Sequence, residues 1–470
     1  MKKITIIIFF FLAATTALSQ NKPNVVFILA DDLGYGDLGC YGQQLIKTPN
    51  LDKLAASGMR FTQFYAGTSV CAPSRAALMT GLHTGHTPVR GNFEIEPEGQ
   101  FPLPNSTFTL AELFQKAGYA AGGFGKWGLG YPGSEGVPTK QGFDRFYGYN
   151  CQRQSHNFFP GHLWDNDQKI ELRNTPSNQQ QYAPDLMQAK ALSFLETHAQ
   201  KPFFMYLAYT LPHAGLQLPE GDSVFEAYKK KFQENPKAVP ATWNGAGYQP
   251  QAYPHAAYAA MVTKLDRYVG EVVAKLKALG MEKNTLVVFA SDNGPHREGG
   301  NQPEYFNSSG SFRGVKRDLY EGGIRVPVIA YWPAVIKEGK TSDYVGAFWD
   351  FLPTFAELAG QPTPRNTDGI SILPTLSSKG TQKGHRFLYW EFHEDGGRQA
   401  VRAGNWKGVR LNVTKRPNAP IELFDLKADP FETKDISAAH PDVVKEITRI
   451  MKEAHVENKD FPLIAKSATR

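Results

Sequence analysis

The chain has 470 residues, with 51 lysines and arginines against 45 aspartates and glutamates, which gives a formal net charge of +6 at pH 7. Hydrophobic residues make up 41% of the sequence and charged residues 20%, proportions typical of a soluble globular protein. So small a charge excess argues against nucleic acid as a partner, because nucleic-acid-binding proteins carry clustered basic residues. The length allows one large domain and one smaller domain, each with its own core.

The N-terminus predicts a secretory signal peptide over residues 1–19. Lys2 and Lys3 form a basic start, residues 4–14 are apolar, and residues 17–19 match a small-x-small cleavage site. The apolar run is too short to span a bilayer, which takes about 20 residues. We therefore expect an exported protein, periplasmic or secreted, without stable membrane insertion.

The chain has three cysteines, an odd number that calls for an explanation in an exported protein. One of them, Cys71, lies in a motif described below. The sequence allows Cys40 and Cys151 either to pair with each other or to remain buried free thiols.

Strand patterns alternate with helix patterns along most of the chain. Apolar runs predict buried strands at residues 24–30, 120–124, 203–209, 286–290 and 326–332. Periodic segments with start and stop signals predict helices at residues 48–58, 106–118, 183–199, 255–279 and 349–359. This alternation predicts an α/β fold with a doubly wound, mostly parallel sheet flanked by helices.

The remaining segments differ from this alternating pattern. Residues 131–184 and 215–254 show little periodicity, and loop regions of that length in a compact domain are usually functional. Residues 399–413 and 421–426 predict a small antiparallel sheet, and residues 441–455 a terminal amphipathic helix. We therefore expect a main domain over residues 20–365 and a C-terminal subdomain over residues 366–470.

Residues 69–81 predict a loop that becomes a helix. Pro73 suits the first turn, Ser74 can serve the free backbone amides there, and Gly81 suits the far end. This places Cys71 just before a helix N-terminus, where backbone amides and the helix dipole favour anions. Arg75 lies one turn further on and can point at the same spot. A nucleophile, an anion-binding helix end and a guanidinium thus fall within five residues.

Two pairs of polar residues directly follow predicted strands. Asp31-Asp32 follows residues 24–30, and Asp292-Asn293 comes shortly after residues 286–290, at the strand ends where open α/β sheets bind ligands. Neighbouring carboxylates repel each other unless a cation or a shared proton relieves them. Because ligands that are all oxygen suit a hard cation, these pairs predict a calcium or magnesium site.

The stretch around Cys71 resembles the signature of the type I sulfatases of the alkaline phosphatase superfamily, through Cys71-Ala72-Pro73-Ser74-Arg75, Leu78 and Thr80-Gly81. The resemblance implies hydrolysis of sulfate esters. It implies that a formylglycine-generating or anaerobic sulfatase-maturating enzyme oxidises Cys71 to formylglycine (3-oxoalanine), the catalytic aldehyde. It also implies that one divalent cation, usually Ca²⁺, is held by Asp31, Asp32, Cys71, Asp292 and Asn293.

Three more segments resemble elements of the same family. Residues 125–130 are similar to its second signature, whose lysine, here Lys126, contacts the sulfate. His213 matches a strand–Pro-His element, and Lys316 matches a lysine that binds sulfate near the leaving oxygen. Many relatives carry a histidine where this chain has Gly128, and that histidine is assigned the collapse of the formylglycine–sulfate adduct. Residues 400–407 and 422–430 resemble the small sulfatase subdomain.

The resemblance implies a catalytic set made of Cys71, Arg75, Lys126, His213 and Lys316. Arg75, the two lysines and the cation would surround the charge that develops on the bridging oxygen. The aldehyde hydrate would supply an oxygen nucleophile, and His213 or Lys316 would protonate the leaving alcohol. The base that replaces the family histidine at Gly128 is not identified by the sequence.

The expected substrate is an O-sulfate on a carbohydrate, bound by Lys126, His213, Lys316, Arg153 and His156. Gly128 and the loop at residues 152–156 look like those of bacterial sulfatases that degrade polysaccharides, some of which act on galactose or N-acetylgalactosamine sulfates.

Two alternative functions compete with this interpretation. A phosphoester or phosphonate ester hydrolase of the same superfold would need a two-metal site with further histidine and aspartate ligands, and Asp292-Asn293 argues against it. A carbohydrate-binding protein on an inactive scaffold is favoured by Gly128 alone. The retained nucleophile, basic residues and metal ligands argue against that second alternative.

Overall fold

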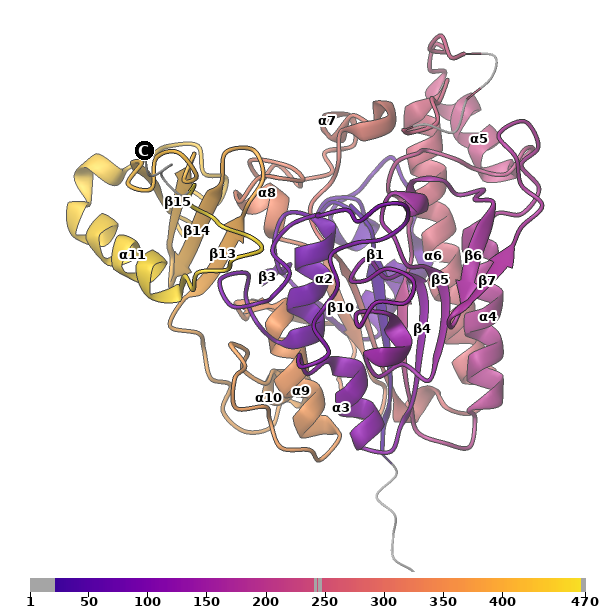
Figure 1. Cartoon of the computed structure of the whole chain (residues 1–470), viewed down its shortest axis with the longest axis horizontal. Coiled ribbons are helices and arrows are strands. Elements are labelled where there is room, and N and C mark those ends of the chain that lie inside the picture. Colours follow the sequence, from indigo (N-terminus) through magenta and orange to yellow (C-terminus); the bar gives the residue numbers. More distant parts are fainter. Residues whose placement is uncertain (1–21, 241–242, 244–246, 466–470) are drawn as a thin grey trace, which may run out of the picture.

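A ten-stranded sheet forms the centre of the molecule. The computed structural model describes residues 22–240, 243 and 247–465 (Figure 1). The strand order is β11-β2-β10-β9-β1-β8-β4-β5-β6-β7. Strands β9, β1, β8, β4 and β5 run parallel in the middle, while β10 and the β6–β7 hairpin are antiparallel to their neighbours. The predicted fold class, a mostly parallel sheet with flanking helices, is confirmed.

The strands of this sheet have the following bounds: β1 Asn24–Ala30, β2 Met59–Phe61, β4 Ala120–Lys126, β5 Arg145–Tyr149, β6 His162–Asp165, β7 Gln168–Glu171, β8 Phe203–Ala208, β9 Thr285–Ser291, β10 Val328–Tyr331 and β11 Lys340–Ser342. A two-stranded sheet pairs β3 (Phe64–Tyr65) with β12 (Gly346–Ala347).

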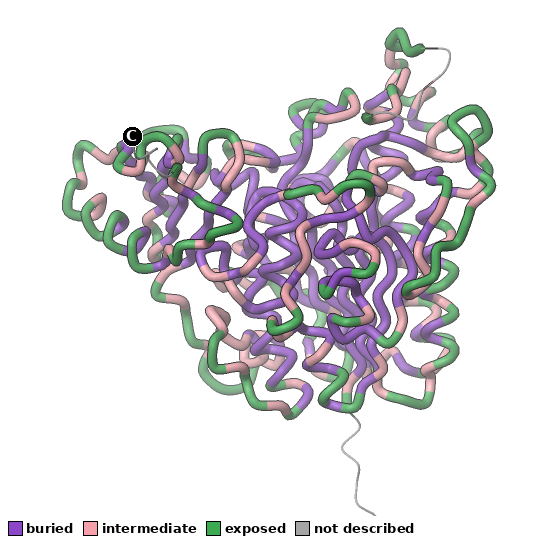
Figure 2. Tube along the Cα trace, viewed as in Figure 1, coloured by how far each residue is buried: buried purple, intermediate pink, exposed green. Residues whose placement is uncertain are grey.

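Helices cover both faces of the central sheet because its middle strands are apolar on both sides. Alternate residues of β1 enter two different cores: Val26 and Ile28 pack in one, Val25 and Phe27 in the other. The first core is closed by α1 (Pro49–Ala56), α4 (Ala183–Thr197) and α6 (Pro254–Ala278). The second is closed by α2 (Cys71–Thr80), α3 (Leu110–Lys116) and α9 (Phe351–Leu358). Figure 2 shows the buried trace concentrated at this centre.

A second, smaller layer lies to one side of the main body (Figure 1). Its four antiparallel strands are β13 (Leu388–Phe392), β14 (Arg398–Ala403), β15 (Trp406–Leu411) and β16 (Ile421–Asp425), and α11 (Pro441–Ala454) packs on them. The Trp390 indole of β13 donates a hydrogen bond to the Ala66 carbonyl of the main body. The small antiparallel sheet is thus confirmed, while the domain boundary at residue 365 stays a prediction.

The structure corrects several local predictions. The helix predicted from residue 106 begins four residues later, because Thr109 and Glu112 form a reciprocal capping box there. The long regions predicted as loops contain β5, β6 and β7 and the helix α5 (Ser223–Phe232). The alternating apolar residues of these short strands were too few to stand out. Three further short helices are α7 (Pro303–Phe306), α8 (Glu321–Ile324) and α10 (Leu373–Ser377).

Cys40 and Cys151 are both free thiols, so the disulfide alternative does not hold in this structure. Cys151 is buried, whereas Cys40 is partly exposed. None of the helices in the described parts of the chain is long and apolar enough to cross a membrane. The predicted signal peptide lies outside the described residues.

Candidate active site

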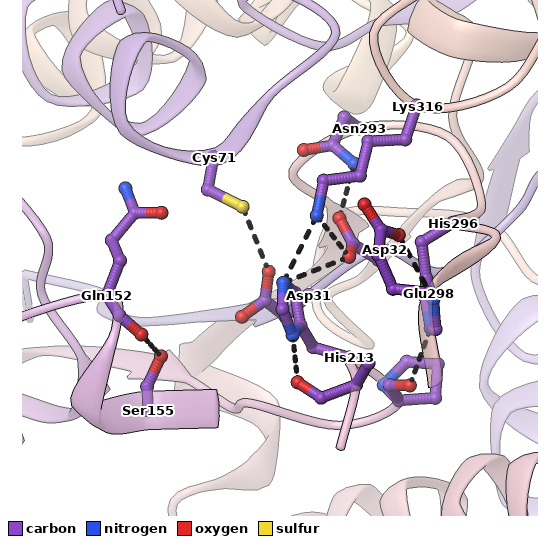
Figure 3. Close-up of polar contacts among 12 residues, drawn as sticks. Asp31, Asp32, Cys71, Gln152, Ser155, His213, Asn293, His296, Glu298 and Lys316 are labelled. Atoms are coloured by element: carbon purple, nitrogen blue, oxygen red, sulfur yellow. Dashed lines mark hydrogen bonds and ion pairs between the residues drawn. The ribbon is translucent and has the colours of Figure 1, made fainter. Parts of the chain in front are cut away.

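The polar residues predicted for the site meet at one edge of the central sheet. Asp31 follows β1, Asp292 follows β9, Lys126 ends β4, and His213 lies shortly beyond β8. Because β9, β1, β8 and β4 are consecutive neighbours and run parallel, their carboxyl ends come together. Cys71, the first residue of α2, faces this edge (Figure 3). The sequence had placed Cys71 one position outside the helix.

Three carboxylates and one amide form the acidic centre of the site. Asp31, Asp32, Asp292 and Asn293 are all fully buried. The Asn293 amide nitrogen donates to Asp32 Oδ1 at 2.7 Å and to the Gly294 carbonyl at 2.9 Å. The other end of this amide, Oδ1, is buried and has no hydrogen-bond donor among the described residues. Asp32 itself adopts a left-handed φ of 62°, a conformation that is uncommon for non-glycine residues.

This donor set fits a hard divalent cation. Its oxygens come from carboxylates and an amide, the ligand types that Ca²⁺ and Mg²⁺ prefer. Asp31, Asp32, Cys71 and His213 also bring one potential ligand atom each within 4.8 Å of one another. The unpartnered Asn293 Oδ1 is the acceptor that such an ion would satisfy, because a buried acceptor without a partner costs free energy.

Three buried cations balance the three carboxylates. Lys126 Nζ lies 2.7 Å from Asp31 Oδ2, and Lys316 Nζ lies 2.7 Å from Asp32 Oδ2. Arg75 places Nε and Nη2 on Asp292 Oδ2 at 3.0 and 2.8 Å, while its Nη1 donates to the Lys126 carbonyl at 2.8 Å. In this structure the Arg75 guanidinium therefore holds the acidic centre in place through Asp292.

The protonation of the two strand-end carboxyls is set by burial and by these cations. Burial alone would raise the pKa of Asp31, but the charges of Lys126 and Arg75 hold it well below its usual range. Burial and the Asp31 charge raise the pKa of Asp292 to about 7. The site therefore keeps Asp31 ionised, whereas the charged form of Asp292 is disfavoured.

Cys71 is a buried thiol rather than a thiolate. Burial is the main cause that raises the pKa of Cys71 well above its usual value, and Asp31 and Asp292 add to the shift. The Cys71 Sγ lies 3.4 Å from Asp31 Oδ1, to which the thiol donates. Since only the thiolate is a strong sulfur nucleophile, this environment does not favour direct attack by Cys71.

His213 and Lys316 form a hydrogen-bonded pair above Asp32. The His213 Nδ1 contacts the Ala214 carbonyl and must donate to it, which leaves Nε2 as an acceptor. Lys316 Nζ donates to that Nε2 at 3.1 Å. Burial and Lys316 lower the pKa of His213 well below its usual value. Burial also opposes the charged form of Lys316, but Asp32 and other nearby groups such as Glu298 together raise its pKa well above the usual value. The mobile proton of this pair therefore sits on Lys316.

The first turn of α2 is capped by a residue from another loop. Asn92 Oδ1 accepts a hydrogen bond from the Ala72 amide at 3.0 Å. The prediction that Ser74 bonds to the free backbone amides of the first turn is wrong. The Ser74 hydroxyl instead accepts from the Gly67 amide at 3.0 Å and donates to the Asp292 carbonyl at 2.5 Å. Ser74 thereby ties α2 to the end of β9.

Gly128 has a left-handed φ of 77° and lies against the side chain of Gln152. A Cβ on Gly128 would lie 3.1 Å from both Cγ and Nε2 of Gln152. Gln152 Nε2 in turn donates to Asn92 Oδ1 at 3.2 Å. Gln152 thus fills the space beside the glycine, and Figure 3 shows its side chain on the same side of the site as Cys71.

The two predicted substrate residues from the long loop lie in different places. Arg153 is half-exposed and forms two hydrogen bonds with the Glu96 carboxylate, at 2.6 and 2.9 Å. His156 stacks on His213, with ring centroids 4.8 Å apart and planes 6° from parallel. A role for either in substrate binding stays a prediction.

Sequence reasoning missed Tyr248 as a neighbour of the site. Its ring centroid lies 4.9 Å from that of His156 and 5.9 Å from that of His213. Tyr248 is one of three tyrosines in the loop-rich segment 215–254, and nothing in the sequence distinguishes it from the other two. The placement depends on contacts between two distant loops.

Comparison with known proteins assigns the chain to a family. The Sulfatase family model matches residues 23–361, and the model for the C-terminal region of N-sulphoglucosamine sulphohydrolase matches residues 311–459. Human arylsulfatase A is 34% identical over 487 aligned positions, which cover 94% of this chain and 88% of that protein. Rat N-acetylgalactosamine-6-sulfatase is 34% identical over 393 positions, covering 78% and 68%.

Solved structures agree with this assignment. The crystal structure of Ps i-CgsB in complex with k-i-k-neocarrahexaose superposes with a TM-score of 0.77 and 30% identity, over 92% of each chain. The phosphonate monoester hydrolase of Agrobacterium radiobacter shares the fold, with a TM-score of 0.63 and 21% identity, over 92% of this chain and 95% of that chain. The family model and the named sulfatase relatives define a sulfuric ester hydrolase. The chain belongs to the sulfatase family, as a type I sulfatase.

Proposed function

We propose that this protein hydrolyses O-sulfate esters on a carbohydrate, using one Ca²⁺ and a formylglycine made from Cys71. The observation that carries the proposal is the acidic centre itself. Three buried carboxylates and the unpartnered Asn293 Oδ1 converge beside a Cys71 thiol that is held neutral. Asp31, Asp32, Asp292, Asn293 and the residue at position 71 would hold the cation.

The chain's own residues would bind and orient the sulfate. A cation taken up by Asp31 and Asp32 would compete with Lys126 and Lys316 for these carboxylates, leaving both ammonium groups to an anionic ester. Formylglycine, when present, supplies a hydroxyl nucleophile that the buried thiol does not. Arg75 would keep Asp292 oriented throughout, because its Nε and Nη2 both donate to Asp292 Oδ2.

Protonation of the leaving alcohol falls to the pair of Lys316 and His213. Lys316 carries the proton in the resting structure and shares it with His213 Nε2 through the 3.1 Å hydrogen bond. Either residue would deliver that proton to the bridging oxygen as the S–O bond breaks. His213 Nδ1 is occupied by the Ala214 carbonyl, so only its Nε2 edge takes part.

The carbohydrate part of the proposal is supported by the relatives. One relative is named an N-acetylgalactosamine-6-sulfatase, and one similar structure contains k-i-k-neocarrahexaose. A galactose or N-acetylgalactosamine sulfate is therefore the substrate class to test first. We also propose export of the protein and maturation of Cys71 by a separate enzyme, both from the sequence alone.

The decisive experiment combines peptide mass with sulfate release. In protein from its native host, the peptide across position 71 should be about 18 Da lighter than the cysteine form, as the aldehyde required for the proposed nucleophile demands. The same preparation should release sulfate from sulfated galactosides and lose this activity when Ca²⁺ is chelated. Active protein that contains only the thiol would overturn the formylglycine mechanism, and faster release of phosphate from matched phosphoesters would favour the alternative hydrolase.

A further inference from the structure

The two long loops of the main domain meet beside the site in an aromatic wall, made of His156 and Tyr248. His156 is packed face to face on His213, and Tyr248 covers His156 at a centroid distance of 4.9 Å. The wall therefore begins at the residue proposed to protonate the leaving group. Its outer member, Tyr248, is partly exposed.

A network of amide side chains fixes Tyr248 in this position. The neighbouring Gln249 accepts hydrogen bonds through Oε1 from Gln217 Nε2 and, at 2.8 Å, from Gln179 Nε2. The Gly215 amide donates to the His156 carbonyl at 3.0 Å, which ties the second loop directly to the first. The wall is thus held from both loops before any substrate arrives.

The Tyr248 side chain has the chemistry of a sugar-binding platform. Burial raises the pKa of its phenol, which therefore stays neutral. Of the nearby charges, Lys316 lowers this pKa and Asp32 raises it. Its hydroxyl makes no hydrogen bond to the part of the chain that the structure describes. An aromatic face attracts the weakly positive C–H groups on one side of a pyranose ring, and the hydroxyl at the ring edge suits a sugar hydroxyl.

We propose that Tyr248, backed by His156, is the platform on which the sugar ring bearing the sulfate packs. This inference rests on the proposed sulfatase function and adds the residue that recognises the leaving group. Sulfate recognition and sugar recognition are then separate: buried lysines bind the anion, and the wall binds the ring. Tyr248 binds the substrate without taking part in the chemical step.

The test compares Tyr248→Ala with Tyr248→Phe on the preferred sulfated galactoside. We expect Tyr248→Ala to raise KM about tenfold, since it removes a stacking surface, with kcat changed less than about twofold. Tyr248→Phe keeps the ring and should raise KM by less than about threefold. The inhibition constant of inorganic sulfate should be unchanged in both, because sulfate alone does not reach the wall.

Tyr305→Ala is the matched control. Tyr305 is 40% exposed and stacks on His255 with centroids 4.0 Å apart, but it lies on α7 outside the site. This variant should keep the wild-type KM. An unchanged KM in Tyr248→Ala, or a kcat lost equally in Tyr248→Ala and Tyr248→Phe, would overturn the platform. A wild-type protein that releases no sulfate from any sugar would instead overturn the proposed function, and the inference with it.

Discussion

Two clusters of buried charge in the described parts of the chain differ in one respect. In the active site, three carboxylates face three cations, yet Asn293 Oδ1 has no donor within the part of the chain that the structure describes. In the cluster that joins the small sheet to the main body, Lys407 donates to Glu321 at 2.9 Å and to Glu432 at 3.2 Å. The Glu321 amide completes that cluster by donating to Glu432 Oε2 at 2.6 Å. A closed cluster serves the fold, whereas a cluster with an open acceptor is prepared for a ligand.

The largest effect is expected at Cys71. Cys71→Ala should lower kcat/KM at least about 10⁴-fold, because it removes the only precursor of the nucleophile. Its thermal midpoint should stay within about 2 °C of wild type, since Cys71 makes a single weak hydrogen bond, at 3.4 Å. Kinetics and thermal unfolding of the purified variant measure both. Cys40→Ala is the control for loss of a thiol and should keep full activity, whereas residual turnover near wild type in Cys71→Ala would contradict the mechanism.

The cluster of Lys407, Glu321 and Glu432, called here the lobe-joining cluster, should affect stability and leave activity nearly unchanged. Lys407→Met leaves Glu321 and Glu432 buried without their shared cation and should reduce the free energy of unfolding by about 3–5 kcal/mol. The kcat of the variant that remains folded should change less than about twofold. Denaturant unfolding with activity assays at low temperature measures both quantities. Lys427→Met removes an exposed lysine and serves as the control. A loss of kcat in folded Lys407→Met would show that the two clusters are coupled.

The same cluster predicts a pH dependence of stability. Burial and the Glu321 charge raise the pKa of Glu432 to about 7, from an ordinary value of 4.5. A carboxyl that binds its proton more tightly in the folded state destabilises the fold as pH rises from about 4.5 to about 7. Lys407 and nearby arginines lower the pKa of Glu321 to about 2, so its contribution changes only below this window. Deprotonation of Glu432 should therefore lower the stability of the fold as the pH rises from about 4.5 to about 7.

Glu432→Gln removes this titration and should flatten the dependence by about 2 kcal/mol over the same interval. Thermal midpoints measured from pH 5 to pH 8 for both proteins give the difference. Glu422→Gln, a half-exposed neighbour on β16, is the control. Parallel curves for wild type and Glu432→Gln would mean that Glu432 stays ionised throughout.

The sequence predicted the active-site cluster far better than the lobe-joining cluster. Asp31 and Asp292 stand at the ends of apolar strands, and parallel strands bring such ends together whatever the loops do. No comparable rule brings Lys407 of β15 to Glu321 of α8, because that contact depends on how two layers pack. Tyr248 was missed as a site neighbour for the same reason. It is positioned by contacts between loops, and loops have no sequence periodicity from which a position could be predicted.

The smallest single contribution is expected at the edge of the active-site cluster, where Gly128 meets Gln152. Gly128→Ala should lower the free energy of unfolding by about 2 kcal/mol, because a Cβ is strained at a left-handed φ and would also press on Gln152. Gly133→Ala isolates the first cause, since Gly133 has a φ of 85° and nothing within 4 Å of its Cβ position. Gly133→Ala should lower the free energy of unfolding by about 1 kcal/mol.

The contact with Gln152 accounts for the difference in destabilisation between the two glycine variants. This difference should disappear when Gln152→Ala is combined with Gly128→Ala. Equal destabilisation by the two single glycine variants, measured by denaturant unfolding, would show that Gln152 yields freely. Gly128 would then be required by its backbone conformation alone.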